Sequence, residues 1–299
     1  MDVTLLSIGD HVRPGAYDVH SRFRRAVNFI SGEGLVSLVS EEVGGGPLNV
    51  VITGPGCERI IASVSQLRVE ADAAFVDGRR FDLGNVHRYR SKLVVCGWSG
   101  ERFFRNLELF RQLLVENSSP GSLAFLVDEG RQSNFATGVE KAFLQRMTRG
   151  AEEVFRGDLL GGVKLLKGCG WGLTPSGDDF LAGLLIGVGL LQKLYRQDFS
   201  SAMDSIHEAA LGGNVLSNSL LNLARKGLLF ERMKKLVAAL LGGEAEEVAA
   251  AARGLFAVGA SSGADLATGF LMAVQAQDQN RFRSGLQLVS KNLTPGIQA

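Results

Sequence analysis

The chain has 299 residues, a formal net charge of +1, 45% hydrophobic residues and 21% charged residues. That length suffices for one large domain or two ordinary ones, and the composition is that of a globular protein with a core. The near-zero charge and the lack of a long Lys/Arg block argue against nucleic acid or an anionic membrane as a partner. The longest uncharged apolar run, residues 180–192, is shorter than the roughly 20 residues of a membrane span, so no membrane segment is expected.

The cysteines and the first residues indicate the compartment. The three cysteines, Cys57, Cys96 and Cys169, form no C-x-x-C pair, and so sparse a set is typical of a reduced intracellular protein. Residues 1–15 lack the basic region and the apolar run of a signal peptide. We therefore expect a cytoplasmic protein.

Up to about residue 100 the sequence consists of short runs rich in Val, Ile, Leu and Phe, which are separated by clusters of turn-forming residues. Short strands at regular spacing are typical of a sandwich or a barrel. The segment DGRRFDLG, residues 77–84, fits a hairpin turn between two short strands. The expected strands cover residues 34–40, 48–53, 66–71, 73–78 and 92–98.

After Gly100 the apolar residues recur at helical spacing. A single proline, Pro175, lies between Gly121 and Thr294, as expected of a mostly helical region, because proline breaks helix interiors. We predict an α+β fold with a β-rich, barrel-like or sandwich-like domain over 1–115 and an α-helical domain over 116–299. The expected helices cover residues 101–117, 134–156, 177–195, 200–211, 214–226, 231–241, 244–258, 264–276 and 279–290.

The stretch GCGWGLTPSGDDFLAGLLIGVGLL, residues 168–191, reads first as a helix start. Thr174 is a good N-cap, and Pro175 fits the first helical position. Asp178 and Asp179 then fall near the positive end of the helix dipole. Gly177 is not explained by this reading, because a glycine in the first turn costs about 1 kcal/mol relative to alanine.

The glycines before the helix indicate a binding site. Gly168, Gly170 and Gly172 alternate with larger residues, and glycines so spaced allow unusual backbone angles or a close approach by a ligand. The alternative is that these glycines only shape the start of the helix and bind no ligand. Gly183 and Gly187, one turn apart, would let another backbone approach the helix.

A second stretch repeats the first. PSGDDFLAGLL, residues 175–185, aligns with SSGADLATGFL, residues 261–271. Two helix starts of the form S-G-x-D-x-x-x-G predict a pseudo-symmetric pair whose N-termini meet at one site if the helices pack through their shared glycines. Chance similarity in a chain rich in Gly, Ala and Ser is the alternative. The matched pairs are Ser176 with Ser262, Gly177 with Gly263, Asp179 with Asp265 and Gly183 with Gly269, while Asp178 becomes Ala264.

Paired helix N-termini attract anions, but three carboxylates oppose a bare anion. The conflict disappears if Mg²⁺ bridges Asp178 and Asp179 to a phosphate. It also disappears if the acids bind amide or ammonium groups, or if they hold the loop by accepting its N–H bonds. Lys164 and Lys167 could contact a phosphate or be solvated lysines on a helix face.

The rest of the sequence offers weaker evidence for a functional site. There is no Walker loop, no Rossmann fingerprint and no hydrolase serine motif, and the four histidines are scattered. Ser217 and Asn218 lie at a later helix start and either face the same site or cap the helix. Cys169 is either reactive or a small packing residue, and Trp171 either stacks on a ligand or covers the loop.

GLTPSGDDFLAG, followed by the later SSGAD helix start, resembles a bacterial family long catalogued as a domain of unknown function. Its best-placed member is the AllH-type subunit of oxamate carbamoyltransferase, which acts in anaerobic allantoin (purine) breakdown. The resemblance covers most of the chain. Relatives often carry histidine where this chain has Ala260, which leaves the role of that position open.

The resemblance implies carbamoyl transfer between phosphate and oxamate, in a complex with unlike subunits. The predicted function is a carbamoyltransferase subunit that binds a small anion such as carbamoyl phosphate or oxamate. The alternatives are a non-catalytic ligand-binding or assembly subunit and, further off, another phosphate-dependent or carboxylase-type enzyme. The predicted site comprises Asp178, Asp179 and Asp265 as catalytic residues; Gly170, Gly172, Thr174, Ser176, Gly177, Ser262, Gly263, Ser217 and Asn218 as ligand-binding residues; and Asp178 and Asp179 as possible Mg²⁺ ligands.

Overall fold

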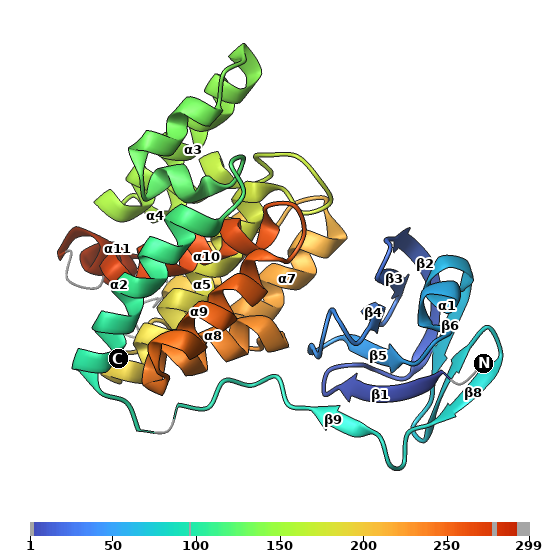
Figure 1. The fold of residues 1–299 in the computed structure, drawn as a ribbon. Coiled ribbons are helices and arrows are strands. Elements are labelled where there is room, and N and C mark those ends of the chain that lie inside the picture. Colours follow the sequence, from blue (N-terminus) through green and yellow to red (C-terminus); the bar gives the residue numbers. More distant parts are fainter. Residues whose placement is uncertain (1–2, 96, 277–279, 292–299) are drawn as a thin grey trace, which may run out of the picture. The chain divides into compact units, whose positions relative to one another are not determined.

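The computed structural model describes residues 3–95, 97–276 and 280–291. The chain divides into two compact units, residues 1–93 with 228–234, and residues 94–227 with 235–299 (Figure 1). A curled nine-stranded sheet at the N-terminal end is followed by a helical region, so the predicted α+β class is confirmed. The sequence placed a boundary between residues 115 and 116, whereas the second unit begins at Val94.

The first unit is built on one sheet with the order β8-β7-β6-β2-β3-β4-β5-β1-β9. Neighbouring strands are antiparallel, except that β4 runs parallel to β5 and β1 parallel to β9. The strands are β1 (Thr4–Gly9), β2 (Gly15–Arg22), β3 (Ala26–Ser31), β4 (Gly34–Ser40), β5 (Asn49–Thr53), β6 (Gln66–Val69), β7 (Ala73–Val76), β8 (Arg79–Asp82) and β9 (His87–Tyr89).

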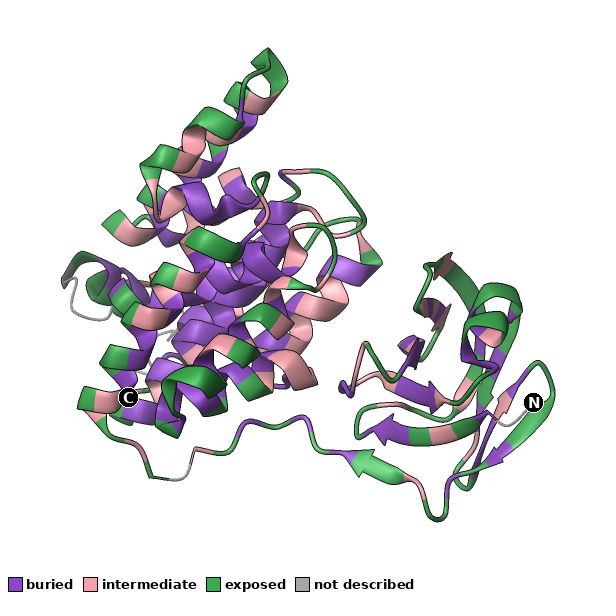
Figure 2. Cartoon of the chain, in the orientation of Figure 1, coloured by how far each residue is buried: buried purple, intermediate pink, exposed green. Residues whose placement is uncertain are grey.

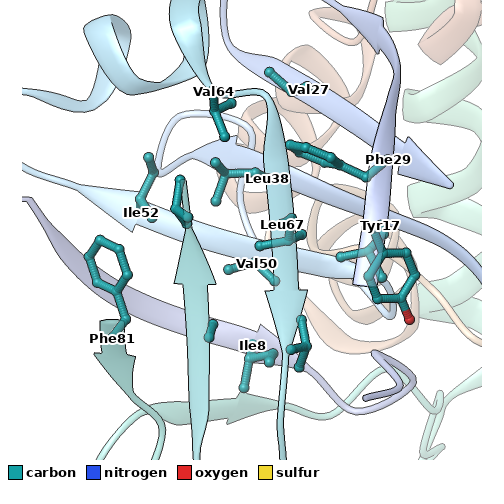
Figure 3. Packing of buried hydrophobic residues seen from close by; sticks show 14 of the residues in the cluster. Ile8, Tyr17, Val27, Phe29, Leu38, Val50, Ile52, Val64, Leu67 and Phe81 are labelled. Carbon is teal, nitrogen blue, oxygen red and sulfur yellow. The ribbon is translucent and has the colours of Figure 1, made fainter. Parts of the chain in front are cut away.

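The inner face of the sheet forms a compact apolar core (Figure 3). On β3 alternate residues, Val27 and Phe29, point inward, as the two-residue period of a strand requires. The short helix α1 (Cys57–Ser63) adds the buried Ile61 to the same core. Asn28, between Val27 and Phe29, donates to Ser21 Oγ at 3.0 Å and accepts from Ser37 Oγ at 2.7 Å, so it links three strands.

A segment from much later in the chain completes this unit. Glu231 Oε2 accepts the N–H of Gly45 at 2.7 Å, and the Glu231 N–H donates to the Gly45 carbonyl at 2.8 Å. The Tyr89 hydroxyl donates to the Leu229 carbonyl at 2.9 Å. The strand expected over residues 92–98 is wrong for its described part, where only an isolated bridge joins Lys92 to Leu228.

The second unit is helical, and α5 and α10 run through its middle (Figure 1). Both are buried along most of their length (Figure 2), which explains why their sequences are apolar on almost every side. Within the described part of the chain, no helix is long and apolar enough to cross a membrane. The elements are α2 (Gly100–Asn117), the 3₁₀ helices η1 (Leu123–Leu126) and η2 (Glu129–Asn134), α3 (Gly138–Arg156), α4 (Leu159–Leu166), α5 (Ser176–Tyr195), α6 (Ser200–Ala210), α7 (Val215–Arg225), α8 (Glu231–Gly242), α9 (Ala245–Phe256), α10 (Ser262–Gln275) and α11 (Asn280–Lys291).

The predicted hairpin turn forms between β7 and β8 and gives the first prediction. Asp77 lies at φ 47°, and its Oδ1 accepts bonds from Ser65 N, Ser65 Oγ and Gln66 N at 2.8–2.9 Å. Asp77→Ala removes this acceptor and strains the backbone, so local stability should fall by about 2 kcal/mol. Asp77→Asn keeps an oxygen acceptor and tolerates the backbone angle, so it is the control. Amide exchange at Ser65 and Gln66 measures the difference, and equal protection in both variants would contradict it.

Candidate functional site

The site is organised by a direct backbone contact between α5 and α10. A methyl group at Gly183 would lie 2.0 Å from the Leu266 carbonyl oxygen, and one at Gly269 would lie 2.0 Å from the Phe180 carbonyl oxygen. One turn on, Gly187 faces Phe270. The contacts advance in the same direction along both helices, so the helices run parallel and begin at the same end. The packing predicted from the shared glycines is therefore confirmed.

The repeat extends into the loops that lead to these helices. The N–H of Gly177 donates to the Cys169 carbonyl at 2.8 Å, and the N–H of Gly263 donates to the Val258 carbonyl at 3.0 Å. A methyl group at either glycine would strike the last turn of the preceding helix, because the carbonyl oxygens of Leu166 and Leu255 lie within 2 Å of its position. The first-turn glycines are thus explained by packing: α4–loop–α5 and α9–loop–α10 are two copies of one unit.

The serines and aspartates of the two copies bond reciprocally. Ser176, at the start of α5, hydrogen-bonds to Asp265 of α10. Ser262, at the start of α10, hydrogen-bonds to Asp179 of α5. Each S-G-x-D start therefore supplies a hydroxyl to the carboxylate of the other, which explains why both residue types occur twice.

Thr174 has a different role from the one predicted. The helix α5 begins at Ser176, its N-cap is Pro175, and no side chain caps it. The N–H of Gly177, a natural target of a cap, is already bound to the loop carbonyl of Cys169. Thr174 Oγ1 instead donates to Asp179 Oδ2 at 3.1 Å and lies 3.3 Å from Ser262 Oγ. The prediction of Thr174 as N-cap and Pro175 as first helical residue is wrong.

The three carboxylates are brought together but are turned into the protein. Asp178, Asp179 and Asp265 are 4%, 2% and 0% exposed. Asp178 Oδ1 accepts the N–H of Gly168 at 2.7 Å and so ties down the glycine loop. Asp265 Oδ1 accepts the N–H of Leu123, at the start of η1, at 2.7 Å, and its Oδ2 accepts from Ser261 Oγ at 2.9 Å. These contacts match the alternative in which the acids hold loops by accepting N–H bonds.

Burial changes the protonation of this cluster. Removal from water raises the pKa of Asp179 well above its usual range, and the neighbouring Asp265 carboxylate raises it further. Burial also raises the pKa of Asp265 to about 7, against the opposing bonds from Leu123, Ser176 and Ser261. Both carboxyls therefore hold a proton to a higher pH than an exposed aspartate does.

The loop between α4 and α5, residues 167–175, is the exposed part of the site. Gly168, Gly170 and Gly172 have φ of 64°, 119° and 99°, which only glycine adopts readily. A methyl group at Gly170 would also lie 2.7 Å from the Ser176 nitrogen. No hydrogen bond among the described residues uses the N–H groups of residues 170–174. Successive backbone N–H groups without a partner inside the protein are a means of binding anions.

The start of α7 lies against this loop through Asn214, a residue that the sequence analysis missed. Its side chain accepts the N–H groups of Leu216 and Ser217 and donates to the Leu173 carbonyl. Asn218 instead bonds both the N–H and the carbonyl of Gly212, at 2.9 and 2.8 Å, and so closes its own loop. Ser217 is 2% exposed, and its Oγ has no partner in the described part of the chain. An Asn directly before a helical run was the available signal for the cap.

Of the remaining candidate residues, one is a buried packing residue and the others are partly or fully exposed. Cys169 is buried, and burial raises the pKa of its thiol, which fits the packing role. Trp171 is 57% exposed and rests on Phe143 with ring centroids 4.8 Å apart. Lys164 is exposed, whereas Lys167 is half-buried and the end of its side chain lies beside Gly212.

The donor set does not favour a resident metal. Among the described residues, no group of three or more His, Cys, Asp or Glu side chains is arranged to hold a metal ion. Asp178 Oδ1 accepts the N–H of Gly168 and Asp179 Oδ2 accepts from Thr174 Oγ1, so one oxygen of each predicted Mg²⁺ ligand is already bonded within the protein. The residues present thus do not fit the predicted Mg²⁺ site.

The matched helix starts invite comparison with known families. Residues 166–274 match the family model of oxamate carbamoyltransferase subunit AllH. The resemblance predicted from the motifs is confirmed over this stretch, which holds both S-G-x-D starts and is well under half of the chain. No curated protein and no solved structure matches the chain.

The glycine contact predicts a position-specific loss of stability. Gly183→Ala and Gly269→Ala place a methyl group against a backbone oxygen that cannot move alone, so each should destabilise the helical unit by about 3 kcal/mol or more. Gly254→Ala in α9 is the control, because a methyl group there meets open space and should stabilise by up to about 1 kcal/mol. Urea unfolding followed by far-UV circular dichroism measures all three, and tolerance at Gly183 and Gly269 would refute the contact.

The buried acids predict a pH dependence. Asp265 has a pKa of about 7 when folded, against about 4 when unfolded, so the folded state binds the proton more tightly. The stability due to this carboxyl is therefore fully present at low pH and is lost as pH rises from about 4 through about 7. Asp265→Asn, which retains the oxygen for Leu123, should flatten the stability profile between about pH 5 and pH 7. Asp198→Asn, at an exposed carboxylate, should leave that slope unchanged, and an unchanged slope in Asp265→Asn would contradict the assignment.

Proposed function

We propose that this chain is a subunit of a carbamoyltransferase of the oxamate/carbamoyl phosphate class and that its glycine loop, residues 167–175, binds a small anionic ligand. The observation that carries the proposal is the run of N–H groups at residues 170–174 that no described residue accepts, on a loop whose residues 171–173 are exposed, within the stretch that matches the AllH family model. The loop is held at both ends, by Asp178 at Gly168 and by Asn214 at Leu173. A loop fixed in this way loses little entropy when a ligand binds.

In this proposal the N–H groups of Gly170, Trp171 and Gly172 receive the oxygens of a phosphate or carboxylate. Lys167, at the end of α4, supplies the positive charge, and Trp171 covers the ligand. Oriented N–H groups stabilise a charge that develops on a carbonyl oxygen during acyl or carbamoyl transfer. Catalysis then rests on positioning and electrostatics, with no covalent nucleophile on this chain.

The carboxylates act in this proposal as positioning residues. Asp178 fixes the loop directly through Gly168. Asp179 and Asp265, with Thr174, Ser176 and Ser262, lock the two helix starts together. The ligand meets the loop and not the buried acids, which removes the conflict between three carboxylates and an anionic ligand.

A second candidate function is a non-catalytic binding or assembly subunit. The observation that favours it is the burial of all three candidate catalytic acids, which leaves no acidic side chain of this motif facing solvent. Both candidates share unlike protein partners and an anion at the loop. They differ in whether transfer activity requires this loop.

Lys167 provides a direct test of anion binding. Lys167→Met should weaken carbamoyl phosphate binding by about tenfold, because a charge-assisted hydrogen bond is lost. Lys164→Met, on the exposed face of the same helix, is the matched control and should bind as the unmodified chain does. Calorimetry of the full chain against phosphate, carbamoyl phosphate and oxamate gives the affinities. Equal affinities in both variants, or no binding of any of the three, would refute the loop as the site.

Asp178 separates a positioning role from a charge-based role. Asp178→Asn keeps an oxygen acceptor for the Gly168 N–H, whereas Asp178→Ala removes it. If Asp178 positions the loop, carbamoyl transfer by the complex with its partner subunits should survive in the Asn variant and fall by about tenfold or more in the Ala variant. Equal loss in both variants would show that the carboxylate charge takes part in the reaction, and activity in both would exclude Asp178 from the site.

A further inference from the structure

The helical unit contains a cavity of about 440 Å³ that none of the predicted site residues lines. It lies between α2, α3, the η1–η2 segment and the C-terminal end of α10. Met272 and Gln275 lie on its α10 wall. Since a helix rises about 1.5 Å per residue, Met272 lies about 15 Å along α10 from Ser262. The cavity is therefore separate from the glycine loop, and its volume falls in the range of small-molecule sites.

The cavity has an apolar floor and a polar rim that carries both signs of charge. Leu126, Phe155 and Met272 supply apolar surface above the buried Phe125 and Ala151. Its charged lining residues are Arg111, Arg156, Glu129 and Glu152, and Arg111 also forms an ion pair with Glu108 of α2 at 3.4 Å. The Arg156 guanidinium lies 3.1 Å from Glu152, on the surface of α3. A rim of equal positive and negative charge favours a ligand that itself bears both, and disfavours a bare anion such as phosphate.

Three uncharged polar side chains add to this pattern. Gln132 of η2 and Gln275 of α10 line the cavity, and an amide both donates and accepts hydrogen bonds. Thr148 also lines the cavity, and its Oγ1 is buried with no hydrogen-bond partner in the described part of the chain. This hydroxyl has no surface open to the cavity, so the two amides are the uncharged polar groups that a ligand can reach.

The cavity wall is fixed by the protein. The guanidinium of Arg131 donates to the carbonyls of Ser118 and Ser119 at 3.0 and 2.8 Å, which anchors η2 to the end of α2. The preceding η1 is held at Leu123 by the carboxylate of Asp265. Phe125 on the cavity floor is fully enclosed and packs edge-on against Phe135 with ring centroids 4.9 Å apart. Because these contacts fix the cavity wall without a ligand, the site is preformed.

We propose that this cavity binds a small amphoteric carboxylic acid, of the class of the free amino acids. The carboxylate of the ligand lies toward Arg111 and Arg156, its ammonium group lies toward Glu129, and its aliphatic part lies against Phe155 and Met272. The site is independent of the glycine loop. It touches that region at one point, since η1 carries the floor residue Phe125 and is held at its start by Asp265.

The test uses L-glutamine as the probe and the methionine methyl groups of the full chain, ¹³C-labelled, as the reporters. The Met272 methyl signal should shift saturably as L-glutamine is added, while Met203 and Met233, in α6 and α8, should not respond. Acetate and ethylamine, which each carry one of the two charges, should bind more weakly by about tenfold or more. Absence of a Met272 shift, or an equal response to acetate alone, overturns the proposal.

Variants locate the binding. Arg156→Gln, on the cavity rim, should weaken the response by about tenfold. Arg149→Gln is the matched control, because Arg149 forms the same type of ion pair on α3, with Glu153, away from the cavity. Ala151→Leu should abolish the response by filling the floor. If that variant fails to fold, the Arg156 and Arg149 pair still decides, since both side chains are on the surface. Equal affinities in these two variants would refute the site, whatever the outcome at the glycine loop.

Discussion

The helical unit depends on the contact between the backbones of α5 and α10. Two helices can approach this closely only where glycine removes the side chain, and Gly183 and Gly269 do so at equivalent positions of the repeat. The contact fixes the helices in parallel with their starts together. It thereby forces Asp179 and Asp265 into one buried space, where each is satisfied by the serine of the opposite motif. The closeness of the two carboxyls follows from the packing of the helices, and their raised pKa values follow from their burial.

The two halves of this repeat are alike in packing and unlike at their surfaces. Ala264 stands where the first copy has Asp178, so only the first loop has a carboxylate that binds its backbone. The first loop is also the longer one and has positive φ at three glycines, whereas the second has it only at Gly259. Packing alone demands no such difference. The asymmetry is what an exposed binding loop added to a symmetric scaffold would produce, and it is the reason to seek the ligand at residues 167–175.

Much of this arrangement was readable from the sequence. The strands at 34–40 and 49–53 and the helices from α5 onward were expected within a few residues, because alternation and helical spacing are strong where one face is buried. The aligned glycines predicted the α5–α10 contact. The short helix α4, LLGGVKLL, was missed because two glycines and eight residues leave no clear period. The capping role expected of Thr174 failed because a loop carbonyl, from Cys169, had already taken the N–H that a cap would bind. Such tertiary competition, like the use of Asp178 and Asp265 as acceptors for distant backbone, has no local sequence signal.

The sheet unit draws on two distant stretches of chain, and this has a consequence for the order in which the protein is made. Gly45 and Tyr89 find their bonding partners at Glu231 and Leu229. A chain is synthesised from its N-terminus, so the nine strands are complete long before these partners exist. During that interval water must form the hydrogen bonds of the Gly45 N–H and carbonyl and of the Tyr89 hydroxyl. The last step in forming the N-terminal unit therefore waits until ribosomes have produced most of the helices that follow it.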